Sequence, residues 1–112
     1  MNVTDEKILR GLLSLYLLRE ICISPKCGYE LNKNISEKLG VVLPKGTVYV
    51  LLKSLFMKGY IQNEKVINTK GKNTLIYRIT DRGNEFMRSH YQPLHLARGI
   101  IDDILLTIDR SL

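Results

Sequence analysis

Apolar residues recur along the chain with two different periods, which predict helices and one β-hairpin. Helical spacing marks four segments: 5–22, 27–39, 45–58 and 94–110. Thr80 suits the N-cap of a further helix that starts at Asp81, and Pro93 is expected to end or kink that helix near Tyr91. Two segments rich in β-branched and aromatic residues, YIQNEKVI (60–67) and NTLIYRIT (73–80), flank the turn NTKGKN. The pattern predicts an α+β fold that is mostly α.

The first and last helices carry more apolar surface than one small domain needs. The first is apolar on nearly every side, so we expect it to meet the domain on one side and a second subunit on the other, through Leu9 and Leu13. The last helix carries an apolar stripe: Ile101, Ile104, Leu105 and Ile108. The core of the same subunit is the alternative for this stripe. Because the first three helices already supply a core, we favour an interface between subunits.

The third helix, within PKGTVYVLLKSLFMKGYI (44–61), has two contrasting faces. One face is apolar, as a core requires: Val48, Leu51, Leu52, Leu55 and Phe56. The opposite face carries Gly46, Tyr49, Val50, Lys53 and Met57. A glycine inside a helix costs about 1 kcal/mol relative to alanine. A glycine, a tyrosine and a lysine together on an outer face indicate a contact surface.

Excess positive charge is confined to the middle of the chain. Residues 1–44 contain six Lys/Arg and five Asp/Glu, a net +1, and residues 81–112 contain four and five, a net −1. Residues 45–80 contain seven Lys/Arg and Glu64 alone, a net +6. So local an imbalance indicates an anionic partner, for which we favour nucleic acid over an acidic protein or a membrane surface.

Other chemistry finds little support in the sequence. Cys22 and Cys27 are too few for a disulfide framework or for a structural zinc site, which needs about four ligands. No catalytic triad, phosphate-binding glycine-rich loop or inward carboxylate pair stands out, so we expect no enzyme, metal ion or cofactor. The apolar run between Arg10 and Arg19 is too short to span a bilayer, and we expect a cytoplasmic protein.

Three helices followed by a hairpin, with the third helix and the hairpin basic, form the layout of a winged helix-turn-helix. An α-helix fits the major groove of B-DNA, where its outward side chains contact base edges or phosphates. A basic hairpin beside it reaches the neighbouring backbone or minor groove. The lysines of both elements would neutralise phosphates and release counterions.

Four stretches of the sequence occur in an order and at a spacing typical of one family. They are ILRGLLSLYLL, CGYELNKNI, LPKGTVYVLLKSLFMKGYI and YRITDRGNEF, which lie within residues 8–90. On these motifs the chain resembles the PadR-type winged-helix transcriptional regulators. The resemblance implies a homodimer that binds a pseudo-palindromic operator in double-stranded DNA and usually represses transcription. A small-molecule effector is compatible with the family, but no residue pattern indicates one.

The expected DNA contacts lie on the third helix and on the wing. They are Lys45, Gly46, Thr47, Tyr49, Lys53, Lys70, Lys72 and Asn73. Alternatives stay open: Tyr49 as a surface side chain packed along a neighbour, Thr47 as a helix cap, and Gly46 as a site of tight packing within the protein. For Lys70 and Lys72 the alternative is a soluble turn without a DNA contact. Tyr29 is expected to pack between the second and third helices, with a DNA contact as the alternative. The roles of Val50 and Met57 stay open between contacts with thymine methyl groups and, for Met57, a position under the wing.

We therefore expect a DNA-binding unit at 1–80 and a helical dimerisation segment at 81–112, within one compact domain. The favoured function is sequence-specific regulation of transcription by a repressor. Two alternatives remain. One is a winged helix for protein–protein assembly, whose basic face meets an acidic partner, and the other is an architectural protein that binds DNA without sequence preference.

Overall fold

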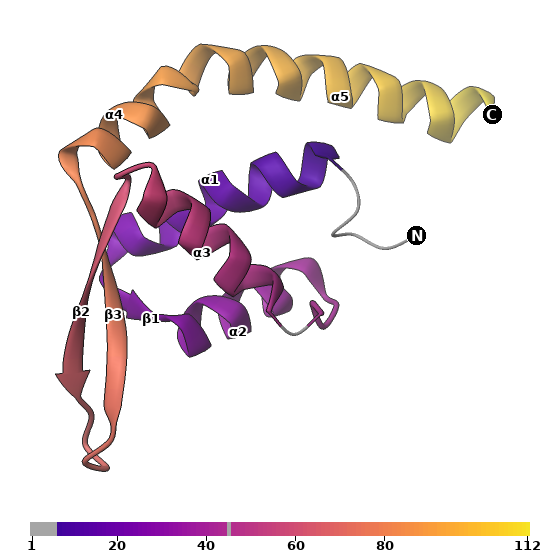
Figure 1. Cartoon of the computed structure of the whole chain (residues 1–112). Coiled ribbons are helices and arrows are strands. Elements are labelled where there is room, and N and C mark those ends of the chain that lie inside the picture. The colour runs from indigo at the N-terminus through magenta and orange to yellow at the C-terminus, as the bar shows by residue number, and fades with distance from the viewer. Residues whose placement is uncertain (1–6, 45) are drawn as a thin grey trace.

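The computed structural model describes residues 7–44 and 46–112, which form five helices and a small antiparallel sheet (Figure 1). The helices are α1 (Lys7–Ile23), α2 (Gly28–Leu39), α3 (Thr47–Met57), α4 (Asp81–Ser89) and α5 (Tyr91–Ser111). The strands are β1 (Lys26–Cys27), β2 (Ile61–Ile67) and β3 (Asn73–Ile79), in the sheet order β1-β3-β2. The mostly helical α+β winged-helix fold expected from the sequence is confirmed.

Some element boundaries differ from the expectation. Strand β1 is not predicted, because two residues are too short to show a period of two. The last helix begins at Tyr91 rather than at residue 94, and Pro93 lies in its first turn, where a missing N–H costs no hydrogen bond. The break between α4 and α5 falls at His90, next to the position near Tyr91 that the sequence predicts. The expected start of the first helix, at residue 5, lies outside the described residues.

The core lies between α1, α2, α3 and the base of the sheet. Its buried apolar side chains are Leu13, Leu17, Leu18, Ile21, Leu31, Ile35, Leu43, Val48, Leu51, Leu52, Leu55, Ile61 and Tyr77. One carboxylate is buried with them: Glu20 of α1 accepts a hydrogen bond of 2.9 Å from the Asn34 side chain of α2 and pairs with Arg19 at 2.6 Å. Because a buried carboxylate needs such partners, these bonds help to hold α2 against α1.

Strands β2 and β3 form a long hairpin that projects beyond the body as the wing (Figure 1). The register runs from the pair Ile61 and Ile79 at the base to the pair Ile67 and Asn73 at the tip. Near the base, Ile61 and Tyr77 are buried in the core, whereas the residues near the tip are largely exposed. The wing is therefore anchored at one end and open to a partner at the other.

Helix α4 packs on the base of the wing through three contacts. Thr80 caps the helix, since its hydroxyl accepts a bond of 3.1 Å from the Gly83 amide and donates one of 2.7 Å to the Gly59 carbonyl. Gly83 lies so close to Tyr60 that a β-carbon there would overlap the Tyr60 carbonyl oxygen. The rings of Tyr60 and Phe86 stack with centroids 4.3 Å apart. These contacts explain why a glycine follows TDR in the motif YRITDRGNEF.

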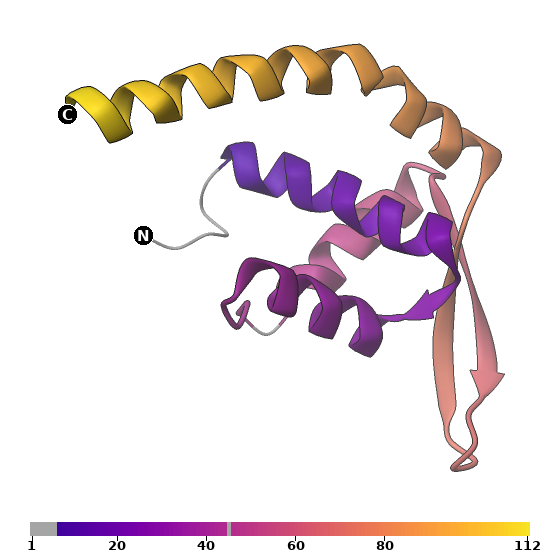
Figure 2. The same cartoon turned by 180° about the vertical axis from the view of Figure 1, so that it is seen from behind.

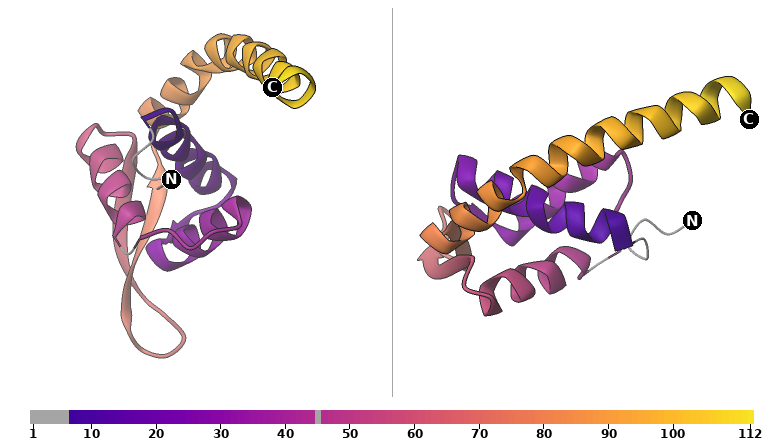
Figure 3. Two further views of the ribbon diagram at one scale, coloured as in Figure 1. Left: turned by 90° about the vertical axis from the view of Figure 1, so that its right-hand side faces the viewer. Right: turned by 90° about the horizontal axis from the view of Figure 1, so that it is seen from above.

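Helix α5 leaves the body as an arm (Figures 2 and 3). None of its residues is buried. The radius of gyration is 16.1 Å, whereas a compact domain of this size has a radius of about 13 Å. Within the described residues, no helix is long and apolar enough to cross a membrane.

Candidate nucleic-acid interface

The start of α3 depends on Gly46. This residue occupies the N-cap with φ of 94°, and its carbonyl accepts the first helical hydrogen bond, 2.9 Å from the Val50 amide. Among the described residues other than its chain neighbours, no atom lies within 4 Å of where its β-carbon would be. The glycine is therefore explained by its left-handed backbone, which disfavours other residues. Two expectations are therefore wrong: Gly46 does not lie inside the helix, and tight packing does not explain it. Gly46, rather than Thr47, occupies the N-cap position.

Tyr49 is held in place by α2. Its ring lies over Gly28, where a β-carbon would come within 2.5 Å of the Tyr49 Cε1 atom. The same side chain is 52% exposed, so one part of the ring packs on α2 and the other faces solvent. Tyr77 lies nearby: burial raises the pKa of Tyr77, and the charge of Tyr49 raises it further. The packing alternative considered for Tyr49 therefore describes part of its environment: the edge that carries the hydroxyl lies nearest Gly28, while the side chain as a whole stays half-exposed.

The rest of the outer face of α3 is open to solvent. Lys53, Val50 and Met57 are exposed, as the sequence predicts. Phe56 was grouped with the core-facing residues, and this is wrong, because it is 43% exposed at the edge of the buried face. Lys45, another expected contact, lies outside the described residues.

Tyr29 lies on the surface and does not pack between α2 and α3. It is 72% exposed in the first turn of α2, so the expected structural role is wrong. The sequence contained a signal against it. At 3.6 residues per turn, Tyr29 lies about 200° around the helix from Leu31, whose side chain is fully buried. Tyr29 therefore presents an exposed aromatic ring next to Gly28, and the alternative of a DNA contact through this ring stays a prediction.

The tip of the wing is organised by Asn68. Its side-chain oxygen accepts hydrogen bonds from the amides of Lys70 and Lys72, at 2.9 and 3.0 Å. Its backbone amide donates to the Lys72 carbonyl at 2.8 Å, which closes the loop. The side chains of Lys70, Lys72 and Asn73 are exposed. The backbone of this basic tip is thus fixed while its charged side chains extend into solvent.

Ion pairing leaves the described lysines of the middle segment unneutralised. In the described part of the chain, the only salt bridges join Arg19 to Glu20 and Arg78 to Glu64. Arg78 of β3 donates from Nε and Nη2 to the same Glu64 oxygen of β2, at 2.9 and 2.7 Å. Glu64 is the only acidic residue of 45–80 and is occupied by arginine. The lysines on α3 and the wing therefore keep their charge for an anionic partner.

The expected dimerisation residues divide between surface and core. Ile101, Ile104, Leu105 and Ile108 of α5 are between 43% and 53% exposed. Leu9 is half-buried on α1, but Leu13 is only 5% exposed and belongs to the core of its own subunit. The assignment of Leu13 to a subunit interface is therefore corrected.

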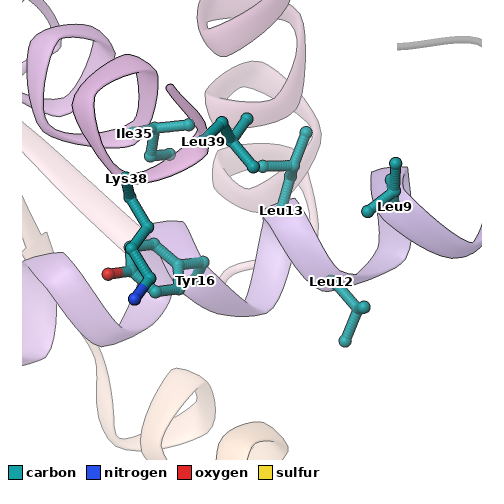
Figure 4. A pocket seen from close by; sticks show the side chains of 7 residues that line it. All are labelled: Leu9, Leu12, Leu13, Tyr16, Ile35, Lys38 and Leu39. Carbon is teal, nitrogen blue, oxygen red and sulfur yellow. The ribbon is translucent and has the colours of Figure 1, made fainter. Parts of the chain in front are cut away.

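An apolar groove lies between α1 and α2 (Figure 4). Its volume is about 190 Å³ and it is lined by Leu9, Leu12, Leu13, Tyr16, Ile35, Lys38 and Leu39. A larger hollow of about 490 Å³ lies between α1 and α5, with Lys58 and His90 on its wall. Lys58 thus faces the arm and not the outer face of α3, although it belongs to the basic segment.

The cysteines and other metal-ligating side chains form no site in the described residues. Cys22 is exposed and Cys27 half-buried, and both thiols are free. Among residues 7–44 and 46–112, no group of three or more His, Cys, Asp or Glu side chains is placed to hold a metal ion.

Comparisons with known proteins agree with this geometry. The sequence model of the PadR-like family of transcriptional regulators matches residues 15–89. A crystal structure of a Thermoplasma acidophilum protein described as a transcriptional regulator is 46% identical, with a TM-score of 0.84, over 91% of this chain and 98% of that one. A PadR-like regulator from Bacillus cereus is 23% identical, with a TM-score of 0.78, over 89% and 97% of the two chains.

A regulator from Clostridium thermocellum is 26% identical, with a TM-score of 0.75, over 88% of this chain and 97% of that one. No curated protein matches the chain. The family match covers α2, α3, the wing and α4, which are the elements that form the interface described above. Proteins of this family regulate transcription through DNA and are not enzymes. The chain belongs to the PadR-like family of transcriptional regulators.

Proposed function

We propose that this regulator binds a specific double-stranded DNA operator as a homodimer and represses transcription there. Helix α3 enters the major groove and the β2–β3 wing contacts the neighbouring minor groove or backbone. The observation that carries the proposal is the outer face of α3, where Tyr49 and Lys53 are exposed beside each other on a helix that the core holds by its opposite face. Such a regulator acts in the cytoplasm, at the nucleoid.

The first turn of α3 is proposed to contact a phosphate. The early amides of a helix have no intrahelical acceptor, and the helix dipole favours an anion at this end. Gly46 and Thr47 lie at this end, and we include Lys45 in the same contact. Tyr49 then supplies a hydroxyl whose position is restricted by Gly28, and Lys53 supplies a charge one turn further along the groove.

The wing tip is proposed to contact the sugar-phosphate backbone. Lys70 and Lys72 carry positive charges on a loop whose backbone is fixed by Asn68, and Asn73 adds an amide beside them. Fixing the loop lowers the conformational entropy that binding would otherwise cost. Phosphate contacts of this kind position a protein on DNA and carry no sequence information themselves.

The homodimer is supported by the apolar surface of the arm. Residues 1–80 form the DNA-binding unit in this proposal, and 81–112 carry the dimer contacts through Ile101, Ile104, Leu105 and Ile108. Leu9 on α1 contributes from the body. Half-exposed apolar side chains cover much of this helix. Removing apolar surface from water is favourable by about 25 cal/mol for each Å². A two-fold dimer would bury this surface and present two identical α3 helices, which requires a pseudo-palindromic operator.

The proposal is tested by DNA binding to the promoter region of the protein's own gene. Binding measured by fluorescence anisotropy should weaken steeply as salt rises. Tyr49→Ala and Lys53→Ala should abolish detectable binding, whereas Lys58→Ala, whose side chain faces the arm, should bind like the parent. If Tyr49→Ala and Lys53→Ala both bind as the parent does, α3 is not the recognition helix. A reporter gene behind the bound promoter should be expressed more strongly when the protein is absent.

The same measurement separates the two alternative functions. Equal affinity for the promoter and for duplexes of random sequence would favour an architectural protein. Failure to bind any duplex, together with capture of an acidic protein by the basic face, would favour an assembly module.

A further inference from the structure

Val50 is an exposed aliphatic residue on the outer face of α3. Its side chain is 57% exposed, whereas Val48, two residues earlier on the same helix, is 1% exposed and belongs to the core. Val50 lies in the first turn of α3, beside Tyr49 and one turn before Lys53. The core holds α3 through Val48, Leu51, Leu52 and Leu55, so the packing of the helix does not depend on Val50.

A valine is a costly choice for such a position. Its β-branched side chain loses rotamer freedom in a helix, so valine is a weaker helix former than alanine or the long polar residues. At 57% exposure, Val50 gains much less burial within the subunit than the core residue Val48 does. A partner that covers the side chain would supply the burial that the subunit does not.

The chemistry of the side chain restricts what that partner offers. Valine neither donates nor accepts a hydrogen bond, so it reads only an apolar feature of DNA. In the major groove each base pair presents donors and acceptors, and the C5-methyl of thymine is the apolar group among them. We infer that Val50 is a specificity-determining residue that contacts a thymine methyl group in each half of the operator. This inference rests on the proposed function, with α3 in the major groove.

Met57 is exposed on the same face but suits this role less well. It is the last residue of α3, and the N-terminal residues of a recognition helix are those that contact base edges. Two turns separate it from Val50, a distance of about 10 Å along the helix axis. Met57 therefore serves as a comparison residue in the test.

The test begins with a duplex selected by the parent protein from a pool of random sequences. Each thymine of the selected duplex is then replaced singly by deoxyuridine, which removes the C5-methyl and keeps the base pair. We expect one substitution in each half-site to weaken binding by the parent about fourfold, the effect of losing one buried methyl-sized group. Val50→Ala should bind the thymine duplex about fourfold more weakly and should lose no further affinity with deoxyuridine at that position.

Two matched variants serve as controls. Val42→Ala makes the same chemical change at a valine that is 91% exposed in the irregular segment between α2 and α3, and it should keep the parent's response to deoxyuridine. Met57→Ala should keep it as well. Because Val50 is exposed and alanine favours helix, Val50→Ala should unfold at the parent's denaturant concentration or above it.

Three results would overturn the inference. If no deoxyuridine substitution affects the parent, no thymine methyl is read. If Val50→Ala responds to deoxyuridine as the parent does, another side chain makes the contact. If the selection enriches no duplex, the proposed function fails and the inference fails with it. This outcome can be told apart from the first two, because both of those require a selected duplex.

Discussion

The ring of Tyr49 on α3 lies directly over Gly28 on α2, and a β-carbon at Gly28 would come within 2.5 Å of the Tyr49 Cε1 atom. These residues belong to two of the motifs, CGYELNKNI and LPKGTVYVLLKSLFMKGYI, that are separate in the sequence. Their contact links the motifs physically: the glycine of one leaves room for the tyrosine of the other. It also determines where the Tyr49 hydroxyl lies on the outer face.

Gly28→Ala should therefore disturb both stability and DNA binding. The added methyl displaces the Tyr49 ring, and over-packing of this kind costs about 1–3 kcal/mol. Denaturant unfolding measures the first effect and fluorescence anisotropy the second. Gly99→Ala is the matched control, because no described atom outside the nearby backbone of α5 and the chain neighbours of Gly99 lies within 4 Å of its β-carbon. It should raise stability by up to about 1 kcal/mol. A double variant with Tyr49→Ala should recover the stability lost in Gly28→Ala; additive losses would argue against the contact.

Gly83→Ala should cost more than Gly28→Ala. The β-carbon would overlap the Tyr60 carbonyl oxygen and would come within 2.8 Å of the Ile79 Cγ1 atom. A backbone oxygen cannot rotate away as the Tyr49 ring can, so α4 must shift off the base of the wing. We expect a loss of about 3 kcal/mol or more in the free energy of unfolding. A loss smaller than that of Gly28→Ala would mean that α4 moves freely on the body.

Tyr77 should make stability depend on pH in the alkaline range. Burial and the charge of Tyr49 raise its pKa above the ordinary value of 10.0. The neutral phenol is the form that the fold accommodates, so the contribution of Tyr77 is fully present below the unfolded pKa. It is lost as pH rises through the higher folded pKa. As pH rises through the ordinary value of 10.0 and above it, Tyr77→Phe should lose less stability than the parent, as measured by thermal unfolding. Tyr91→Phe, at an exposed position, should behave like the parent.

Lys70→Gln and Lys72→Gln should each flatten the salt dependence of DNA binding. Removing one phosphate contact lowers the slope of log K against log salt concentration by about 1. The affinity should fall equally for all sequences, because phosphate contacts carry no sequence information. Lys58→Gln removes the same charge from the side of the molecule that faces the arm and should leave the slope unchanged. If the parent and the three variants give equal slopes of log K against log salt concentration, the wing does not contact DNA.

Leu105→Glu should convert the proposed dimer to monomers in sedimentation experiments. The substitution would place a charge within the apolar stripe of α5, where an unpaired carboxylate would be desolvated. Leu106→Glu is a matched control, because Leu106 is similarly exposed but lies about 100° around the helix from Leu105, on the side away from the rest of the stripe. It should remain dimeric. If Leu105→Glu also remains dimeric, the interface lies elsewhere.

Much of the fold could be predicted because its signals are local. The hairpin is visible in β-branched residues on both sides of NTKGKN, and α3 is visible in the helical spacing of its buried residues Val48, Leu51, Leu52 and Leu55. Errors arose where a residue lies at the border between two faces. Phe56 is apolar, but it is 43% exposed at the edge of the buried face. The expectation that Tyr29 is packed between helices rests on its aromatic side chain. Its position on the helix, on the opposite side from Leu31, already indicated that it faces away from the core.

The sequence by itself determined the order and type of the elements, the confinement of positive charge to residues 45–80, and the family motifs. These features follow from periodicity and composition, which depend on residues close together in the chain. The tertiary structure alone decided that Tyr49 rests on Gly28, that Gly46 caps α3 with a left-handed backbone, and that Leu13 is core while α5 stays exposed. The physical reason is that periodicity defines the faces of a helix, whereas the packing of all the helices together decides which neighbour each face meets.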